Sequence, residues 1–129
     1  MKVKFSRDVV YVPEFNGNME LPPEEQMSVK LGVMDMLDYV DLAEALQVAT
    51  NGASEISSDK LNLGQIKALV KNSGEYIPKY ASDLKGLEDE NGTVDVQSLL
   101  KYPVYFPLAA EILLELVNIS TLSEADVKN

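Results

Sequence analysis

The segment from Val104 to Ile119 constrains the fold more than any other part of this chain. On a helical wheel its polar residues, Glu111, Glu115 and Asn118, form one narrow stripe. Every other side is apolar, with large residues at Leu108, Ile112, Leu113, Leu114, Leu116 and Val117. A helix that is apolar on nearly every side must be buried on nearly every side. We therefore predict that it is the central core helix of a small domain.

The N-terminal quarter of the chain has the pattern of extended strands. Residues 2–12 are rich in valine and aromatic residues, and their apolar parity changes near Ser6–Asp8, which indicates a bulge or two short strands. In the run 26–33 the alternating apolar positions are Met27, Val29, Leu31 and Val33. The turn signal Asn16-Gly17-Asn18 lies between the two runs. We predict a β-hairpin or small antiparallel sheet over residues 1–34.

From Asp35 onward, apolar residues recur with the spacing of a helix. Asp35 is predicted to cap a helix that stops at Asn51-Gly52, with an acidic side formed by Asp38, Asp41 and Glu44. Its predicted core-facing series is Met36, Tyr39, Val40, Ala43 and Leu46. The next helix is predicted to be capped by Ser57, Ser58 or Asp59.

A second apolar series, spaced by three and four, runs from Leu63 to Leu87. Ser73-Gly74 and Pro78 are predicted to break it into two shorter helices. Asp95 or Thr93 is predicted to start a short helix that continues through Lys101. The fold class is therefore α+β, in which an N-terminal hairpin or small antiparallel sheet is followed by a compact bundle of about four helices. We predict a single domain, 1–129, with a helical body over 35–119 and a polar tail over 120–129.

The composition excludes most catalytic chemistry, because the chain has no Cys, His or Trp. Thiolate nucleophiles, imidazole bases and ordinary zinc sites all need residues that are missing. Carboxylate catalysis by Glu111 and Glu115 remains as a hypothesis, but a lone polar stripe usually faces solvent. Residues 87–98 resemble a calcium loop that has Leu87 and Ser98 where acidic ligands are needed. We therefore expect no enzyme activity, no cofactor and no metal site.

The charge balance argues against nucleic acid and anionic membranes as partners. Acidic residues number 21 and basic residues 11, which gives a net charge of −10. Arg7 is the one arginine and the lysines are scattered, whereas phosphate recognition uses clustered basic residues. Residues 102–119 are interrupted by two prolines and two glutamates, so we expect no membrane span there. Residues 1–12 contain no apolar signal core, and the predicted location is cytoplasmic.

A protein partner fits the remaining features best. The apolar helix and the aromatic residues just before it have the composition of an interface core. The partner is either a second copy of the chain or a client protein. The predicted partner-binding residues are Tyr105, Phe106, Leu113, Leu114, Leu116 and Val117.

The order of these features resembles the tail assembly chaperones of long-tailed bacteriophages. A short opening hairpin (KVKFSRDVVYVPEF, NGN, MELPPEEQMSVKL) precedes a helical body, and the chain closes on EILLELVNISTLSEADVKN. The resemblance implies a protein that binds the tape measure protein and keeps it soluble until tail tube protein polymerises around it. It also implies the shorter product of a frameshift pair, located in the bacterial host cytoplasm and not in the mature virion.

A different class of protein stays open as an alternative. A small acidic inhibitor or immunity-type protein would use Asp38, Asp41 and Glu44, together with Glu88-Asp89-Glu90, to block a basic target. Such an acidic mimic should lose affinity steeply with salt, whereas a chaperone that binds through apolar surface should not.

Overall fold

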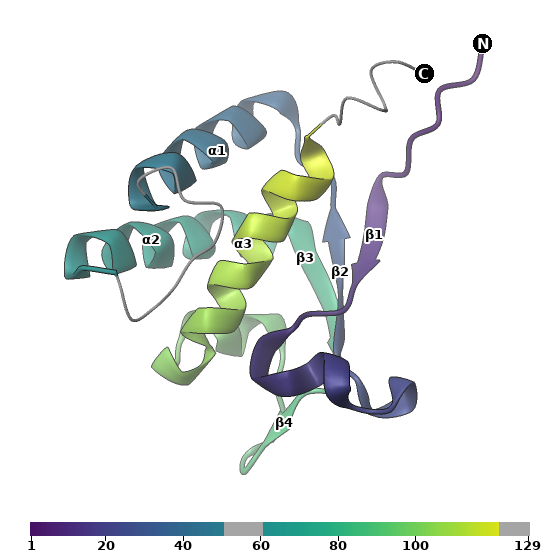
Figure 1. Ribbon diagram of the computed structural model, residues 1–129, viewed down its shortest axis with the longest axis vertical. Helices are drawn as coiled ribbons and strands as arrows, with labels where there is room; N and C mark the ends of the chain where they lie inside the picture. Colours follow the sequence, from purple (N-terminus) through teal and green to yellow (C-terminus); the bar gives the residue numbers. More distant parts are fainter. Residues whose placement is uncertain (51–60, 122–129) are drawn as a thin grey trace.

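Three antiparallel strands form one sheet in the order β1-β2-β3, with helix α3 in front of it and helices α1 and α2 beside α3 (Figure 1). The computed structural model describes residues 1–50 and 61–121. The strands are β1 (Asp8–Tyr11), β2 (Ser28–Gly32) and β3 (Ala81–Lys85). The helices are α1 (Met36–Thr50), α2 (Leu63–Tyr80) and α3 (Phe106–Ser120). An α+β fold with a small antiparallel sheet and a helical body is thus confirmed.

β2 is the central strand and has the alternation that its sequence predicts. Val29 and Leu31 are fully buried, and the intervening residues are half-buried. The register pairs Val9 with Leu31 on one side, and Leu31 with Ala81 on the other. The sheet therefore gains its third strand from a segment about fifty positions further along the chain.

The link between β1 and β2 is longer than a tight hairpin turn. It contains two 3-10 helices, η1 (Phe15–Glu20) and η2 (Pro23–Glu25). Asn16 and Gly17 have positive φ angles of 54° and 74°, so the predicted turn is present inside η1. The buried Asn18 amide donates to the carbonyls of Pro13 and Met27 and accepts from the Met27 N–H at 2.7 Å. This side chain therefore closes the loop.

Helix α1 begins where the sequence predicts, but part of its predicted core side is exposed. The Asp35 carboxylate accepts from the Asp38 N–H at 2.9 Å, as an N-cap does. The buried residues are Leu42, Leu46 and Ala49, while Met36 is 86% exposed. The predicted core-facing series is therefore confirmed for Leu46, which is buried, and for Tyr39, which packs against the core, but it was wrong for Met36 and Val40, which are exposed. The predicted stop at Asn51-Gly52 and the caps at residues 57–59 lie outside the described residues.

Helix α2 is continuous, contrary to the predicted break. A capping box at its start joins the Asn62 side chain to the Gln65 N–H, and the Gln65 side chain to the Asn62 N–H. Gly74 lies within the helix, and Pro78 lies in its last turn, where its missing N–H removes one helical hydrogen bond but the Ala81 N–H still donates to the Ile77 carbonyl. The chain then passes directly into β3, so the later part of the predicted helical series is extended.

The segment between β3 and α3 consists of short elements that lead the chain back to the core. They are the hairpin strands β4 (Glu88–Asp89) and β5 (Gly92–Thr93), and the 3-10 helices η4 (Val96–Leu100) and η5 (Pro103–Tyr105). Asp95 caps η4 as predicted, because its carboxylate accepts from the Ser98 N–H at 3.0 Å. The predicted tail beyond Thr121 lies outside the described residues.

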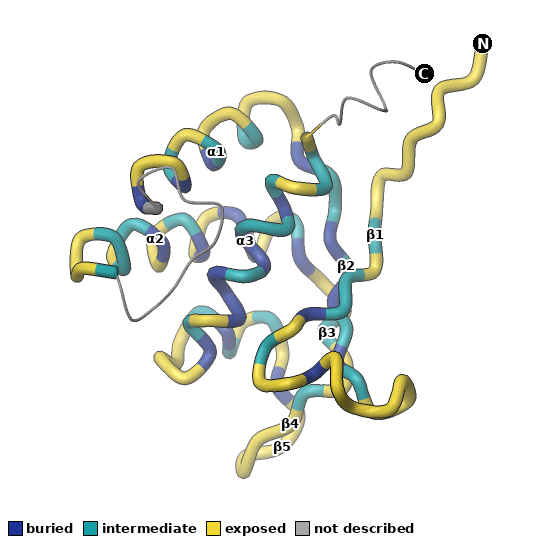
Figure 2. Tube along the Cα trace, in the orientation of Figure 1, coloured by how far each residue is buried: buried dark blue, intermediate teal, exposed yellow. Residues whose placement is uncertain are grey.

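Helix α3 is the core helix that the sequence predicts. Its fully buried residues include Leu108, Ile112, Leu113 and Leu116, and buried segments surround it on the other elements (Figure 2). The segment Pro103–Ser120 is also long and apolar enough to cross a membrane by length and composition, despite the interruptions noted in the sequence. In this fold the apolar side chains of α3 pack against the sheet and the other helices.

Candidate functional site

An apolar groove of about 390 Å³ lies between α2, η4 and the start of α3. Its walls are mainly aliphatic and aromatic, and Lys101 is the basic side chain among them. The remaining lining residues are Ile66, Val70, Ser73, Leu99, Leu100, Tyr102, Pro103, Phe106 and Ala109. A volume of this size is within the usual range of ligand-binding clefts, which is roughly 300–1,000 Å³.

The groove is open because α2 buries only part of its apolar side. Leu69, Tyr76 and Ile77 reach the core, but Val70 stays 50% exposed. On the opposite wall Tyr102 is 55% exposed, and Pro103 begins η5, which leads the chain into α3. Apolar side chains that are left half-exposed along a concave surface are typical of a binding site.

The floor of the groove offers no free hydroxyl. Ser73 is buried there, and its hydroxyl donates to the Leu69 carbonyl of its own helix at 2.8 Å. A ligand in the groove would therefore meet mainly apolar surface, together with the polar groups of Lys101 and Tyr102 on one wall. This arrangement suits the side chains of an apolar peptide or helix better than a charged small molecule.

The structure separates the six predicted partner-binding residues into two groups. Tyr105, Leu113 and Leu116 are buried in the core, so direct contact with a partner is not open to them. That part of the prediction is corrected, because the side of α3 to which these residues belong packs against the rest of the fold. The half-buried residues are Phe106, Leu114 and Val117.

Of these six residues, Phe106 lines the groove. Other parts of the groove are lined by Ile66 and Val70 on α2, and by Leu100 and Tyr102. Ile66, Val70 and Leu100 were missed as a site, although Ile66 and Val70 belong to the apolar series of α2. Their residual exposure depends on how η4 and η5 fold back, which no local pattern indicates.

In the polar stripe of α3, Glu111 has a structural role. The Glu111 carboxylate accepts from the Tyr11 hydroxyl at 2.5 Å, from the Glu14 N–H at 2.7 Å and from the Phe15 N–H at 3.1 Å. Glu111 therefore ties the end of β1 and the start of η1 to α3. The prediction that the whole stripe faces solvent was wrong for this residue.

Burial and charge affect the groups around Glu111. Burial, assisted by the Glu111 carboxylate, raises the pKa of the Tyr11 hydroxyl above its ordinary value. Burial also raises the pKa of Glu115, and the negative charge of Glu111 adds to that effect. Raised pKa values keep the Glu115 carboxyl group and the Tyr11 hydroxyl protonated to higher pH. Neither residue lines the groove. The geometry therefore supports a structural role.

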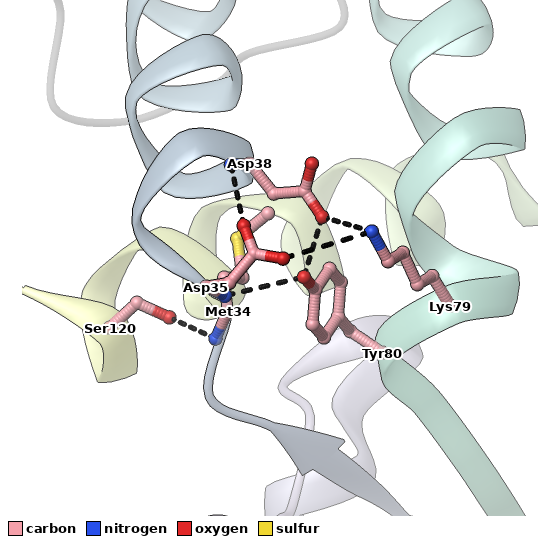
Figure 3. A network of polar contacts seen from close by, with 6 residues as sticks. All are labelled: Met34, Asp35, Asp38, Lys79, Tyr80 and Ser120. Atoms are coloured by element: carbon pink, nitrogen blue, oxygen red, sulfur yellow. Dashed lines mark hydrogen bonds and ion pairs between the residues drawn. The ribbon is translucent and has the colours of Figure 1, made fainter.

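A second polar cluster joins the N-terminal end of α1 to the C-terminal end of α2 (Figure 3). The Asp38 carboxylate accepts from Lys79 Nζ at 2.5 Å and from the Tyr80 hydroxyl at 2.6 Å. The hydrogen bond from Lys79 and then that from Tyr80 hold the pKa of Asp38 below its ordinary value. Close by, the Ser120 hydroxyl accepts from the Met34 N–H at 3.0 Å, which joins α3 to the same corner.

The acidic surface of the inhibitor alternative is thus partly used within the fold. Asp38 is engaged by Lys79 and Tyr80, and the Asp89 carboxylate accepts from the Tyr105 hydroxyl at 2.5 Å and the Asn91 N–H at 2.8 Å. These contacts lower the pKa of Asp89 and raise the pKa of Tyr105 to about 12. Asp41 and Glu44 remain exposed on α1.

The loop that resembles a calcium site is a short hairpin. Glu88 pairs with Thr93 and Asp89 with Gly92, so the chain turns between Asp89 and Gly92. The Asp89 carboxylate is turned toward Tyr105, and the Asp95 carboxylate caps η4. Within residues 1–50 and 61–121, no three acidic side chains gather as a metal site would require.

Comparison of the chain with protein-family models, with curated proteins and with solved structures finds no match.

Proposed function

We propose that this protein binds apolar segments of a client protein in the groove between α2, η4 and α3, without catalysis. The observation behind this proposal is the groove itself, about 390 Å³ in volume and lined mainly by aliphatic and aromatic side chains. The sequence resemblance to phage tail assembly chaperones supplies the client. It is the tape measure protein, whose helices need cover before assembly.

The chemistry of the groove suits an amphipathic helix. Helices that bind in grooves insert apolar side chains three or four positions apart, and the partner surface provides apolar walls for them. Tyr102 and Phe106 are on one wall, and aromatic residues often contribute much of the binding energy at interfaces. Val70 and Ile66 form the facing wall on α2. A client helix would therefore be held by side-chain burial rather than by ion pairs.

The net charge of −10 supports the same function. A chaperone must keep an apolar client from associating with other clients while it covers only part of the apolar surface. A high charge of one sign on the complex opposes that association. Exposed acidic residues such as Asp41, Glu44 and Glu90 are available for this role.

Co-expression with a tape measure protein tests the proposal. Val70→Asp and Tyr102→Asp replace half-exposed groove residues, so the fold should survive while client solubility falls. The matched control is Met36→Asp, which places the same charge on an exposed residue of α1. We expect soluble client with the control and with the unchanged chain, and aggregated client with the two groove variants.

A peptide titration measures the same binding directly. Because the chain has no Trp, a leucine-rich helical peptide with a single tryptophan can be followed by fluorescence without background. We expect the dissociation constant to rise at least about tenfold in Tyr102→Asp, which corresponds to about 1.4 kcal/mol. Equal binding by the groove variants and the control would contradict the proposal. Binding that disappears with added salt would instead favour the acidic inhibitor.

A further inference from the structure

The two segments that line the groove have a charge opposite to that of the whole chain. Residues 63–74 on the α2 wall contain Lys67 and Lys71, and residues 96–110 on the wall of η4, η5 and α3 contain Lys101. Neither segment contains an aspartate or a glutamate, although the chain has 21 acidic residues against 11 basic ones. The surroundings of the groove are therefore a basic region of an acidic protein.

The spacing along α2 places its two lysines beside the apolar wall. Ile66 and Val70 line the groove and are four residues apart, so they lie one turn apart on the same side of the helix. Lys67 and Lys71 each follow one of them by a single position and are exposed. They form a parallel row about 100° further round the helix, away from the side of the buried Leu69. The lysines therefore border the groove on its solvent side.

The facing wall supplies the third lysine. Lys101 lines the groove and is exposed. The acidic residue that precedes this wall, Asp95, is used by the fold, because its carboxylate accepts from both the N–H and the hydroxyl of Ser98 at 3.0 Å. Both walls of the groove thus have lysine at their outer edge. We call Lys67, Lys71 and Lys101 the rim lysines.

The charges of the rim lysines are available to a bound segment. Within residues 1–50 and 61–121 the ion pairs are made by Lys30 and Lys79, and none involves a rim lysine. Glu75 is exposed four positions after Lys71 but makes no ion pair with it. A helix bound in the groove would therefore have uncompensated positive charge along both of its sides.

We propose that the groove selects client helices whose apolar stripe is flanked on both sides by aspartate or glutamate, a specificity that rests on the function proposed above. Burial of the stripe supplies the affinity, and the rim lysines determine which apolar helices are accepted. Lysine or arginine in the flanks would place like charges together, which disfavours such a helix. At physiological salt, charges are screened beyond about 8 Å, so the rim lysines act on a bound helix more strongly than acidic residues elsewhere on the surface.

A displacement experiment tests this selection at the groove itself. A leucine-rich helical peptide with one tryptophan and glutamine in both flanks is bound first, and its fluorescence is free of background because the chain has no Trp. Two competitors without tryptophan share the same leucine stripe. One has glutamate in both flanks and the other has lysine, and these two residues have similar helix propensities.

The glutamate competitor should displace the bound peptide at a concentration at least about fivefold lower than the lysine competitor, at a salt concentration of about 0.15 M. The net charge of −10 alone would favour the lysine competitor. Local charge at the groove and overall charge therefore predict opposite orders.

Reversal of the rim charges tests which residues cause the preference. In the triple variant with Lys67→Glu, Lys71→Glu and Lys101→Glu, the lysine competitor should become the stronger one by at least about fivefold. All three side chains are exposed, so circular dichroism should show an unchanged fold.

The matched control is the triple variant with Lys2→Glu, Lys4→Glu and Lys85→Glu, which changes the net charge equally at exposed positions outside the groove. It should keep the order of the unchanged chain. Equal displacement by the two competitors, or an order that inverts in both triple variants, would overturn the selection while client binding stands. A glutamine-flanked peptide that does not bind at all would overturn the proposed function and the selection with it.

Discussion

The Tyr11 hydroxyl donates a 2.5 Å hydrogen bond to the Glu111 carboxylate, across 100 positions of the chain. The same carboxylate accepts the backbone N–H groups of Glu14 and Phe15, where the chain leaves β1. Because α3 is the core helix, these three hydrogen bonds fix the N-terminal strand to the most buried element of the fold. Glu111 therefore joins the end of β1 to α3, in addition to the pairing of β1 with β2.

Glu111→Ala should lower the free energy of unfolding by about 2 kcal/mol, because hydrogen bonds to a charged acceptor are lost and two backbone donors lose their partner. Urea denaturation measures the change. Glu115→Gln is the matched control one helical turn away. It should be neutral or slightly stabilising at pH 7, because burial already disfavours the charged form of Glu115. Equal destabilisation by both substitutions would contradict this role for Glu111.

Asn18→Ala should destabilise the protein by about 2 kcal/mol, since it leaves the buried Met27 N–H without its acceptor. Asn18→Asp should also destabilise, because a carboxylate cannot donate to the two carbonyls that the amide contacts. Asn16→Gly is the control in the same turn, and we expect little change because glycine accepts its positive φ of 54°. Thermal melting of the three variants measures these changes. A melting temperature for Asn16→Gly as low as those of the two Asn18 variants would contradict this role for Asn18.

Two glycines should respond to alanine in opposite directions. At Gly74, inside α2, an added Cβ meets no described atom within 4 Å, so Gly74→Ala should stabilise by about 0.5–1 kcal/mol. At Gly86, φ is +80° and a Cβ would lie 2.9 Å from the Gln26 carbonyl oxygen. Gly86→Ala should therefore destabilise by about 2 kcal/mol or more. If both substitutions shifted the urea midpoint in the same direction, the different backbone environments described for Gly74 and Gly86 would be disproved.

Stability should fall in acid through Asp38 and Asp89. Lys79 lowers the pKa of Asp38 in the folded state, and Tyr105 lowers that of Asp89. A carboxyl group whose pKa is lower when folded stabilises the protein above its unfolded pKa, near 3.8, and this contribution is lost as the pH falls through the folded value. The urea midpoint should thus drop steeply below about pH 4.

Asp38→Asn provides the comparison for that titration. It should lower stability at pH 7 and flatten the acid limb of the profile, because one of the two groups no longer titrates. Asp41→Asn, three positions along the same helix and exposed, should leave the profile almost unchanged. A profile that is equally steep in Asp38→Asn and the unchanged chain would show that this carboxylate does not couple to folding.

The spacing of apolar residues predicted the elements whose buried residues follow a regular strand or helix pattern. β2 alternates because one face is buried, and α3 is apolar all round because the fold encloses it. The buried side of α1 could be predicted only in part, because apolar residues occur on several of its sides. Asp38 was assigned to the solvent side, yet it is fixed by Lys79 from another helix.

β3 and the groove depend on long-range packing. The strand residues Ser82 and Asp83 are polar and exposed, so no alternation marks them. Leu84 extends the helical spacing of α2 by coincidence, and this favoured a helix over residues that pair with β2 instead. The groove forms because η4 packs back against α2. Such features follow from tertiary contacts, which a single sequence pattern does not contain.

The late position of α3 in the described chain has a consequence for synthesis on the ribosome. β2 gains its second neighbour when residues 81–85 have emerged, and the core closes only after α3 follows. Until then Val29, Leu31 and Leu42 lack the helix that covers them in the finished fold. The domain should therefore fold after translation has passed α3 rather than in stages during elongation. During that interval these apolar side chains lack the burial that the finished fold gives them.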